Sequence, residues 1–402
     1  MITITNDLLD PQAVNDPYSY FKQIRDDDPV YWNDRWKGWI ITKYDDVYAL
    51  LQDPRISADR ISKQIMDKMP TEGQYVAEVM KKWMPLIDPP NHTRVRRVLQ
   101  KAFSPRVIGA MRETIQKIVD QAIDEIKDRQ NIDVVSDYAF SIPSNVLSSM
   151  MGLPTEDFDK IKTWTHDLNT LVFIDLSVKD RHIIAYHAVK EMSAYFEEKF
   201  EERKREPGSD LISSLIEANE GGILSDEELI AQAILLFQAG HETTTGMIAS
   251  SVLALLKNPS QLQLLKENPS LIDSAVEEFI RYDGAAKAVV RVAKEDIEIR
   301  NKIIKKGERL LLVNGAANRD EEKFDNPDQL DITRQPNPHL GFGTGSHYCL
   351  GNQLARLEVK VAVNSLLQRI THLELANEEQ LSWESTIVGR LLKSLDVHIK
   401  VD

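Results

Sequence analysis

The chain contains a single cysteine, Cys349, in a segment that could support thiolate chemistry. The segment from Phe342 to Gly351 reads FGTGSHYCLG, and a strongly helical run begins at Leu350. Glycines serve where a backbone takes a positive φ or approaches another group closely, so we expect a tight loop that presents the sulfur at the start of a helix. A helix N-terminus favours negative charge and therefore the thiolate. The alternative is a small buried hydrophobic side chain, which is a common role of cysteine.

A second segment interrupts an otherwise apolar helical run, AILLFQAGHETTTGMIASSVLALL, at residues 240–245. Glycine and threonine are poor helix-interior residues, and the carboxylate of Glu242 is costly to bury unless it is paired. Threonines such as Thr243 can bond back to the preceding turn and loosen a helix. A central helix that loses stability in this way is expected to line a site. The alternative is a kink with Glu242 on the surface.

Two pairs of polar side chains have helical spacing. Glu278 and Arg281 lie three residues apart and can form an ion pair on one helix face. His92 and Arg96 lie four apart at a helix start, in DPPNHTRVRR, and could act together as donors to a carboxylate or a phosphate. On spacing alone, a solvated helix face explains either pair as well.

Two further donors extend this set. Arg291 follows the two valines of a strand candidate, and His347 lies two residues before Cys349. If they converge with His92 and Arg96, these donors would surround a ligand that carries more than one carboxylate. A thiolate on one side and cationic donors around it suit haem, because the iron takes an axial ligand and the propionates need partners.

The composition indicates a soluble globular protein with a large core. The chain has 402 residues, of which 42% are hydrophobic and 28% charged. Its net charge of −14 argues against a general affinity for nucleic acid or an anionic membrane. The N-terminal MITITNDLLDPQAV lacks the features of a signal peptide, and no apolar run reaches the roughly 18 residues of a membrane span. With one cysteine there is no intramolecular disulfide framework. We therefore expect a cytoplasmic protein.

The elements that would position the candidate residues are mainly helices. Two strands are predicted at 30–32 and 38–42, within an N-terminal part of about 1–60 that is richer in β-structure. Ser225 and Glu228 form a capping box that opens a helix running to Leu256. Other helices are predicted at 17–28, 44–52, 105–129, 178–204, 260–267, 271–282 and 350–369, with strands and turns over about 288–315. Neither a repeat nor a low-complexity linker is visible, so we predict one domain over residues 1–402, mainly α with small β-sheets (α+β).

In their sequence order, these motifs resemble those of the cytochrome P450 family. FGTGSHYCLG is similar to its cysteine signature, AGHETT to its oxygen-activating helix motif, EEFIR to its E-x-x-R motif and HTRVR to its propionate-binding H-x-x-x-R. GAANRD and the stretch from FDNP to HLGFG also resemble family segments, so that the likeness covers about residues 17–400.

The resemblance implies the cytochrome P450 fold, with haem b (iron protoporphyrin IX) between the long central helix and the helix of the cysteine loop. Cys349 would be the axial ligand of the iron, and Phe342 would pack against the ring near the sulfur. The backbone N–H groups after the cysteine, including that of Gly351, would moderate the charge of the thiolate. The propionates would be held by His92, Arg96, Arg291 and His347. Glu278 and Arg281 would stabilise the haem-binding core together with a downstream arginine, Arg319 or Arg334.

The resemblance also assigns residues to the opposite side of the haem. Glu242 and Thr243 would form an acid–alcohol pair that relays the protons consumed in oxygen activation. Ala239 and Gly240 would leave room for oxygen and substrate. The predicted substrate pocket is apolar and consists of Leu86, Leu235, Ala239, Ala286, Val289, Val290 and Ile387. Lys287 lies within one of these segments and could meet a substrate carboxylate or face solvent.

The activity implied is that of a monooxygenase that inserts one atom of O2 into an apolar small molecule such as a fatty acid, a steroid, a terpenoid or a macrolide-like intermediate. Electrons would come from NAD(P)H through a separate reductase and a ferredoxin or flavodoxin, because the chain has no flavin or iron–sulfur pattern. Such partners are acidic, so we expect a basic docking patch from Arg97, Lys101, Arg106 and Arg356. We expect a monomer without nucleic-acid or membrane partners.

Three alternatives remain open from the sequence. The first is a peroxide-driven member of the same fold, which would not need the relay of Glu242 and Thr243. The second is a haem-binding sensor or carrier without turnover. The third is a hydrolase with Cys349 as nucleophile and His347 as base, which would leave the other donors unexplained.

Overall fold

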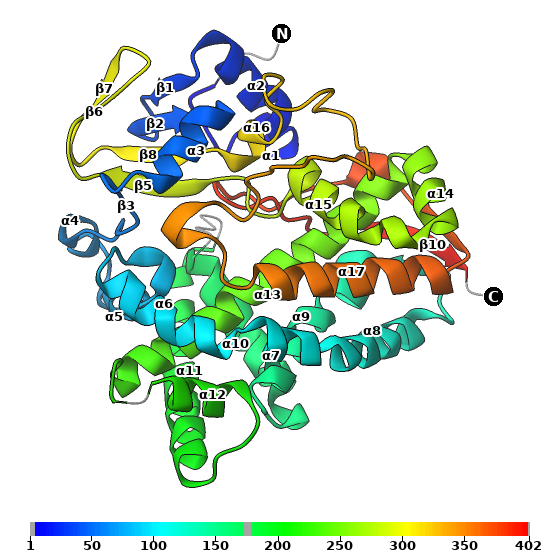
Figure 1. The fold of residues 1–402 in the computed structure, drawn as a ribbon, viewed down its shortest axis with the longest axis horizontal. Helices are drawn as coiled ribbons and strands as arrows, with labels where there is room; N and C mark the ends of the chain where they lie inside the picture. Colours follow the sequence, from blue (N-terminus) through cyan, green and yellow to red (C-terminus); the bar gives the residue numbers. More distant parts are fainter. Residues whose placement is uncertain (1–4, 173–177, 220, 401–402) are drawn as a thin grey trace. The chain divides into compact units, whose positions relative to one another are not determined.

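The fold was examined in a computed structural model, which describes residues 5–172, 178–219 and 221–400. Residues 1–4, which belong to the N-terminal segment considered above, lie outside this range. The described chain is mainly helical with small sheets, as predicted (Figure 1). It divides into two compact units. The first comprises Met1–Ile56, Ile115–Ile142 and Glu242–Asp402, and the second comprises Ser57–Thr114 and Pro143–His241. The single-domain organisation stays a prediction.

The first unit contains the sheets. Their strands are β1 (Val30–Asn33), β2 (Gly38–Ile41), β3 (Ile56–Ser57), β4 (Asn131–Asp133), β5 (Val289–Ala293), β6 (Ile297–Ile299), β7 (Lys302–Ile304), β8 (Arg309–Leu312), β9 (His372–Leu375) and β10 (Asp396–Lys400). The largest sheet has the order β1-β2-β8-β5-β3, in which β2 and β8 are parallel and the β1–β2 and β5–β8 pairs are antiparallel. A second sheet has the order β4-β10-β9, and β6 pairs with β7.

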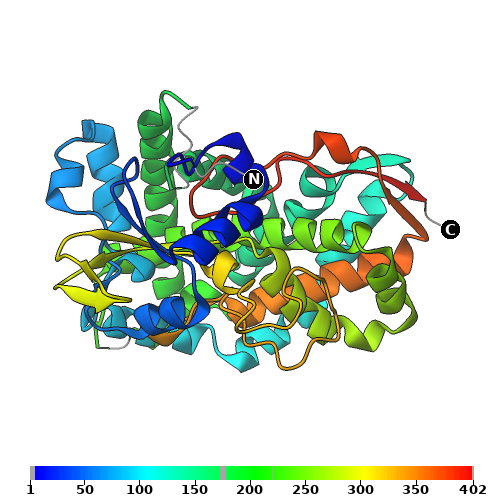
Figure 2. The same cartoon turned by 90° about the horizontal axis from the view of Figure 1, so that it is seen from above.

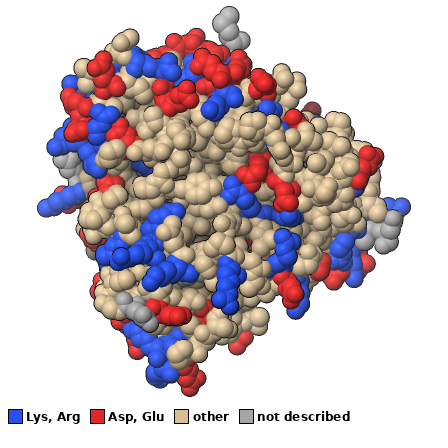
Figure 3. Space-filling model, in the orientation of Figure 1, with Lys and Arg blue, Asp and Glu red and all other residues tan. Residues whose placement is uncertain are grey.

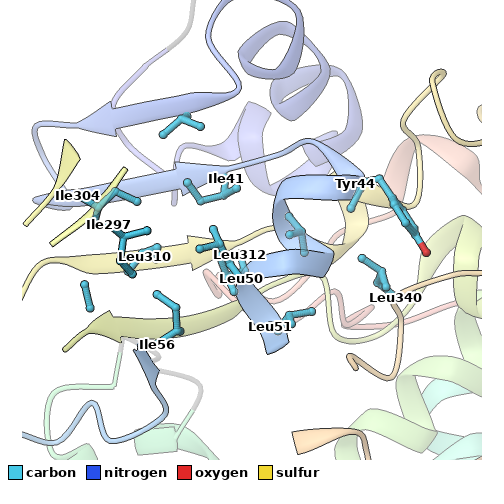
Figure 4. Close-up of a cluster of buried hydrophobic side chains, with 14 of the residues drawn as sticks. Ile41, Tyr44, Leu50, Leu51, Ile56, Ile297, Ile304, Leu310, Leu312 and Leu340 are labelled. Atoms are coloured by element: carbon cyan, nitrogen blue, oxygen red, sulfur yellow. The ribbon is translucent and has the colours of Figure 1, made fainter. Parts of the chain in front are cut away.

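Alternation along the strands of the largest sheet separates two hydrophobic clusters. Leu310 and Leu312 of β8 belong to one cluster and Leu311 to the other, and Ile41 and Ile40 of β2 divide in the same way. This follows from the two-residue period of a strand. Figure 4 shows the first of these clusters, in which side chains from the strands meet those of α3 (Tyr44–Gln52). Both faces of the sheet are thus buried.

The first unit also contains helices, some of which contribute side chains to these two clusters. They are α1 (Pro11–Asn15), α2 (Pro17–Asp27), α3, α8 (Arg112–Ile126), α14 (Pro259–Glu267), α15 (Ile272–Asp283), α16 (Asn314–Ala317) and α17 (Asn352–Arg369), with a π-helical turn at Val134–Ala139 and 3-10 turns at Pro269–Leu271, Gly345–His347 and Glu378–Gln380. Helix α15 carries the E-x-x-R motif, and helix α17 follows the cysteine loop. The two helices lie side by side in Figure 1 and Figure 2.

The second unit is helical. Its elements are α4 (Lys63–Met66), α5 (Thr71–Met80), a 3-10 turn at Met84–Leu86, α6 (Asn91–Ala102), α7 (Pro105–Ala110), α9 (Ser141–Met150), a 3-10 turn at Thr155–Asp157, α10 (Phe158–Val172), α11 (Arg181–Arg205), α12 (Leu211–Ala218) and the first half of α13 (Asp226–Leu256). The capping box of α13 is confirmed, because Ser225 Oγ accepts from the Glu228 N–H at 3.2 Å and the Glu228 carboxylate accepts from the Ser225 N–H at 2.9 Å.

Some predicted boundaries differ from the structure. The helix predicted over 105–129 is two helices, α7 and α8, and the weakly patterned segment 55–87 contains α5. Helix α17 begins at Asn352, so Cys349 precedes the helix rather than standing at its first turn. Within the described ranges, no helix is long and apolar enough to cross a membrane.

Candidate active site

The cysteine loop owes its shape to glycines. Gly343 and Gly345 have φ values of +68° and +71°, a region that side chains other than glycine rarely adopt. A Cβ on Gly341 would lie 2.3 Å from Cγ2 of Ile280, so this glycine is required for close packing against α15. The Cys349 N–H donates to the carbonyl of Phe342 at 3.0 Å, which closes the loop. Cys349 itself is half-buried.

The long helix α13 is mostly buried, but it becomes accessible to solvent at the segment that sequence analysis selected. Leu235 through Gln238 are buried, but Ala239 is exposed, and Glu242 and Thr243 are half-buried before burial resumes at Thr244. Residues 239, 242 and 243 have the i, i+3, i+4 spacing of one helix face. The helix is continuous from Asp226 to Leu256, and Glu242 is half-buried rather than fully exposed. The segment is therefore an accessible face on a helix that is otherwise largely buried.

Gly240 has a packing role of its own. A Cβ at this position would lie 2.9 Å from Cδ1 of Leu147 on α9. Its neighbour Gln238 donates through Nε2 to Oδ1 of Asn169 on α10 at 3.1 Å, and both side chains are buried. This amide pair was not found in the sequence, where neither residue belongs to a motif.

The E-x-x-R pair is part of a buried network. Glu278 and Arg281 are fully buried and form two hydrogen bonds, of 2.8 and 2.7 Å. Arg334 donates to both carboxylate oxygens of Glu278 at 3.1 and 3.2 Å. Arg319 instead donates to the Tyr282 carbonyl and to Asp328, so Arg334 is the downstream arginine of the two that we considered.

The four predicted propionate partners divide between the two units. Arg291 on β5 and His347 in the 3-10 turn belong to the same unit as Cys349, whereas His92 and Arg96 lie on α6 in the other. His92 is 1% exposed and Arg291 8% exposed, so the solvated face that spacing alone allowed for His92 is excluded. The predicted pocket residues divide in the same way, with Leu86, Leu235 and Ala239 in the second unit.

The other pocket residues lie on two adjoining segments of the first unit. A bridge pairs Ala286 with Gly389, and the Lys287 N–H donates to the Val388 carbonyl at 2.9 Å. Ala286, Val289, Val290 and Ile387 are half-buried. Lys287 is only 4% exposed, so it does not face solvent. Burial and, to a lesser extent, the charge of Arg390 lower its pKa to about 7, although Asp283 opposes this shift.

Comparisons with known proteins give a consistent result. The family model for cytochrome P450 matches residues 31–399. The chain is 39% identical to the biotin biosynthesis cytochrome P450 of Bacillus subtilis (strain 168), over 94% of this chain and 95% of that protein. It is 36% identical to vitamin D(3) 25-hydroxylase of Pseudonocardia autotrophica, over 97% and 95%. The crystal structure of P450BioI in complex with acyl carrier protein that carries hexadec-9Z-enoic acid is 37% identical, with a TM-score of 0.91, and the match covers 97% of this chain and 99% of that chain.

Proposed function

The chain belongs to the cytochrome P450 family of monooxygenases, and on that premise we propose that it inserts one oxygen atom from O2 into an apolar small molecule, with Cys349 as the ligand of a haem b iron. When bound, haem supplies the iron that activates O2, and a cysteine ligand favours cleavage of the O–O bond. The observation that carries the proposal is the accessible face of α13, which combines the exposed Ala239 with the half-buried Glu242 and Thr243.

The donor set fits haem. One half-buried sulfur in a tight loop can serve as the soft axial ligand. His92, Arg96, Arg291 and His347 would hold the propionates, because arginine forms paired hydrogen bonds with carboxylates. Among the described residues, no group of three or more His, Cys, Asp or Glu side chains could hold a bare metal ion.

Glu242 and Thr243 would handle the protons of the reaction. The Thr243 hydroxyl would hold a water and pass its proton into the site, and the Glu242 carboxylate would exchange protons with solvent because it is half-buried. This relay favours O2 over peroxide as the oxidant. A haem-binding sensor would not need the relay, and a hydrolase would not need the propionate partners.

We test the relay with Thr243→Ala. The variant should consume NAD(P)H but divert reducing equivalents to peroxide, because the hydroxyl that holds the proton donor is lost. Thr244→Ala is the matched control, since this neighbouring threonine is buried on another face of the helix. Equal product per NAD(P)H in Thr243→Ala and the wild type would remove Thr243 from the relay. A peroxide-driven enzyme would give full turnover with peroxide alone.

We further propose that the substrate carries a long apolar chain, with a fatty acyl group as the first candidate. The predicted lining is apolar, and the chain resembles the protein that was crystallised with an acyl-loaded carrier protein. A spectral titration of the ferric protein should compare a free fatty acid, the same acyl group on a carrier protein, a steroid and a terpenoid. Displacement of water from the iron by a steroid only would contradict the acyl proposal.

Electrons would arrive at a basic surface of the second unit. Residues 91–112 contain six Lys or Arg residues and neither Asp nor Glu, in a chain whose net charge is −14. Arg97, Lys101 and Arg106 in this segment are exposed, and blue side chains gather over α6 in Figure 3. An acidic ferredoxin or flavodoxin, reduced by a separate NAD(P)H-dependent reductase, would dock here. The cytoplasmic location and the monomeric state stay predictions.

Charge reversal tests this surface. Glutamate at Arg97, Lys101 or Arg106 should slow reduction by the redox partner most strongly at low ionic strength, because salt screens exposed charges. Lys257→Glu is a suitable control, since this exposed lysine lies in the other unit. Unchanged reduction rates in all three variants would refute the patch. Arg356, which we also expected here, is bound to Glu277 and has a different environment.

A further inference from the structure

Arg356, on the first turns of α17, lies at the centre of a hydrogen-bonded network around the cysteine loop. Its Nη2 donates to Oε2 of Glu277 on α15 at 2.9 Å, and its Nε donates to the other oxygen of the same carboxylate. Its Nη1 donates to Oδ1 of Asn352 at 2.7 Å. The guanidinium is therefore fixed in orientation by two partners on different helices, which a flexible surface arginine would not be.

One branch of this network reaches the backbone of the cysteine. Asn352, whose Oδ1 accepts from Arg356, donates through Nδ2 to the carbonyl of Cys349 at 2.7 Å. The Cys349 N–H in turn donates to the carbonyl of Phe342. Both polar groups of the Cys349 backbone are thus held, and one of them depends on a side chain that Arg356 orients.

A second branch reaches the aromatic ring of the loop. The guanidinium carbon of Arg356 lies 4.4 Å from the centroid of the Phe342 ring, which is within the range of a cation–π contact. The centroid of the His339 ring lies 6.1 Å from the centroid of the Phe342 ring. Arg356 therefore contacts the loop at Phe342 and, through Asn352, at Cys349.

The carboxylate of Glu277 binds both His339 and Arg356. His339 Nδ1 accepts from the Gly341 N–H at 3.2 Å, so its Nε2 carries the proton and donates to Glu277 at 2.9 Å. Burial alone would raise the pKa of Glu277, but the hydrogen bonds from His339 and Arg356 and the charge of Arg356 lower it to about 2. Glu277 therefore remains a carboxylate at any physiological pH, and the guanidinium stays held.

We propose that Arg356 is a positioning residue for the thiolate of Cys349: it fixes the cysteine carbonyl through Asn352 and the Phe342 ring by direct contact, and so sets the environment of the sulfur. This proposal rests on the assignment of Cys349 as the haem ligand. A loop held at both points keeps the sulfur at a fixed position, which preserves the thiolate and the reduction potential of the iron it binds.

Four variants separate positioning from other effects. Arg356→Ala removes both branches, whereas Asn352→Ala removes the bonds of Asn352 to the Cys349 carbonyl and to Arg356 but leaves the contact of Arg356 with Phe342. Arg356→Lys keeps the positive charge but cannot donate to Glu277 and Asn352 with the geometry of a guanidinium. Lys360→Ala is the matched control, because Lys360 lies one turn later on α17 and pairs with Asp273 on α15 but does not contact the loop. Each holoprotein is measured by its midpoint potential and by the Soret band of its reduced carbon monoxide complex.

We expect Arg356→Ala to raise the midpoint potential, because a protonated or lost thiolate no longer stabilises the ferric iron, and to increase several-fold the fraction of the complex whose Soret band indicates a protonated or lost thiolate. Arg356→Lys should resemble Arg356→Ala, and Asn352→Ala should show a smaller change in the same direction. Lys360→Ala should match the wild type in both measurements even if its thermal stability falls. If Arg356→Ala does not retain haem, Asn352→Ala and Glu277→Gln carry the test.

Two results would overturn the proposal. One is an Arg356→Ala protein with the potential and the Soret band of the wild type. The other is equal effects of Arg356→Ala and Lys360→Ala, which would indicate general loosening of the two helices. A wild-type protein that lacks the red-shifted Soret band of a thiolate complex would instead refute the proposed function itself.

Discussion

Helix α15 carries two buried groups of charged side chains, and they differ in how completely they are paired. The first lies on its last turns and consists of Glu278 and Arg281, joined by Arg334. Here the Arg281 guanidinium donates to Glu278 and also to the carbonyls of Asn318, Pro327 and Gln329. The Glu278 carboxylate accepts further from Asn337. Charge and hydrogen-bonding capacity are both satisfied.

The second group lies where α15 ends. Asp283 accepts from Tyr18 at 2.6 Å and from Arg390 at 3.1 Å, and Arg390 also donates to the carbonyls of Val14 and Asn15. Lys287 is buried beside this group, but the described part of the chain offers its ammonium neither a hydrogen-bond acceptor nor an ion pair. Burial thus lowers the pKa of Lys287 to about 7.

The difference shows what holds a buried charge in place. In the first group each cation has nearby carboxylate or carbonyl oxygens, so the charges persist and stabilise the core. In the second group, Arg390 and Lys287 share the carboxylate of Asp283. Lys287 makes no bond to it, so its ammonium loses a proton more readily. The first group should therefore be essential for stability, whereas Lys287 should reduce it.

The largest effect is expected for Arg281→Ala. Because it leaves the Glu278 carboxylate buried with fewer partners, we expect a loss of about 3–5 kcal/mol in the free energy of unfolding. Denaturant unfolding followed by circular dichroism measures this loss. Arg55→Ala, which removes an exposed pair with Asp53, is the control and should change little. Similar losses in both variants would mean that the buried network contributes no more to the free energy of unfolding than an exposed ion pair does.

The next effect has the opposite sign. Lys287→Met should stabilise the protein at pH 6 by up to roughly 4–5 kcal/mol, because one unit of pKa shift corresponds to about 1.4 kcal/mol and the pKa falls from 10.5 to about 7. The folded pKa of Lys287, about 7, lies below the unfolded value. The lysine therefore destabilises the fold fully below pH 7, and this penalty fades as the pH rises from 7 toward about 10.4.

The pH dependence of the unfolding midpoint checks this prediction. The advantage of Lys287→Met over the wild type should be largest at pH 6 and should decrease steadily up to pH 10. Lys306→Met, which replaces an exposed lysine in the same unit, should show no such trend. An advantage that is constant with pH would indicate better packing of methionine rather than relief of a buried charge.

A smaller effect is expected for Asp283→Asn, at roughly 2 kcal/mol of destabilisation, because Arg390 and Lys287 then lack their shared carboxylate. The loss should be smaller when Lys287→Met is already present, since one of the two cations is gone. A double-mutant cycle of unfolding free energies measures this coupling. Additive effects would show that Asp283 and Lys287 do not interact.

The smallest effect is expected for Tyr18→Phe. It removes one hydrogen bond to Asp283 and leaves the rest of the group intact, so we expect a loss of about 1 kcal/mol. Burial first, and then the Asp283 charge, raise the pKa of the Tyr18 hydroxyl. The phenol is therefore the donor at every physiological pH, and the loss should not vary with pH between 6 and 9. If the loss of unfolding free energy does vary with pH in this range, the Tyr18 hydroxyl itself titrates there.

Much of the fold followed from local patterns. The strands β1 and β2, helix α3 and the capping box of α13 were predicted because alternation, helical spacing and capping act within a few residues. Helix α5 was missed because the methionines and charged residues of the segment 55–87 show no sustained period. The break between α7 and α8 was missed because Pro105 opened a pattern that continued across it.

The sequence by itself determined the family, the lone sulfur of Cys349 in its glycine loop and the unusual segment around Glu242 and Thr243, because residue types and short spacings carry that information. The tertiary structure decided which partners these residues have. It selected Arg334 rather than Arg319 for Glu278, buried Lys287, and turned Arg356 from a surface charge into a support of the cysteine loop. These outcomes depend on contacts between segments far apart in the chain, and burial at such contacts changes both pairing and pKa.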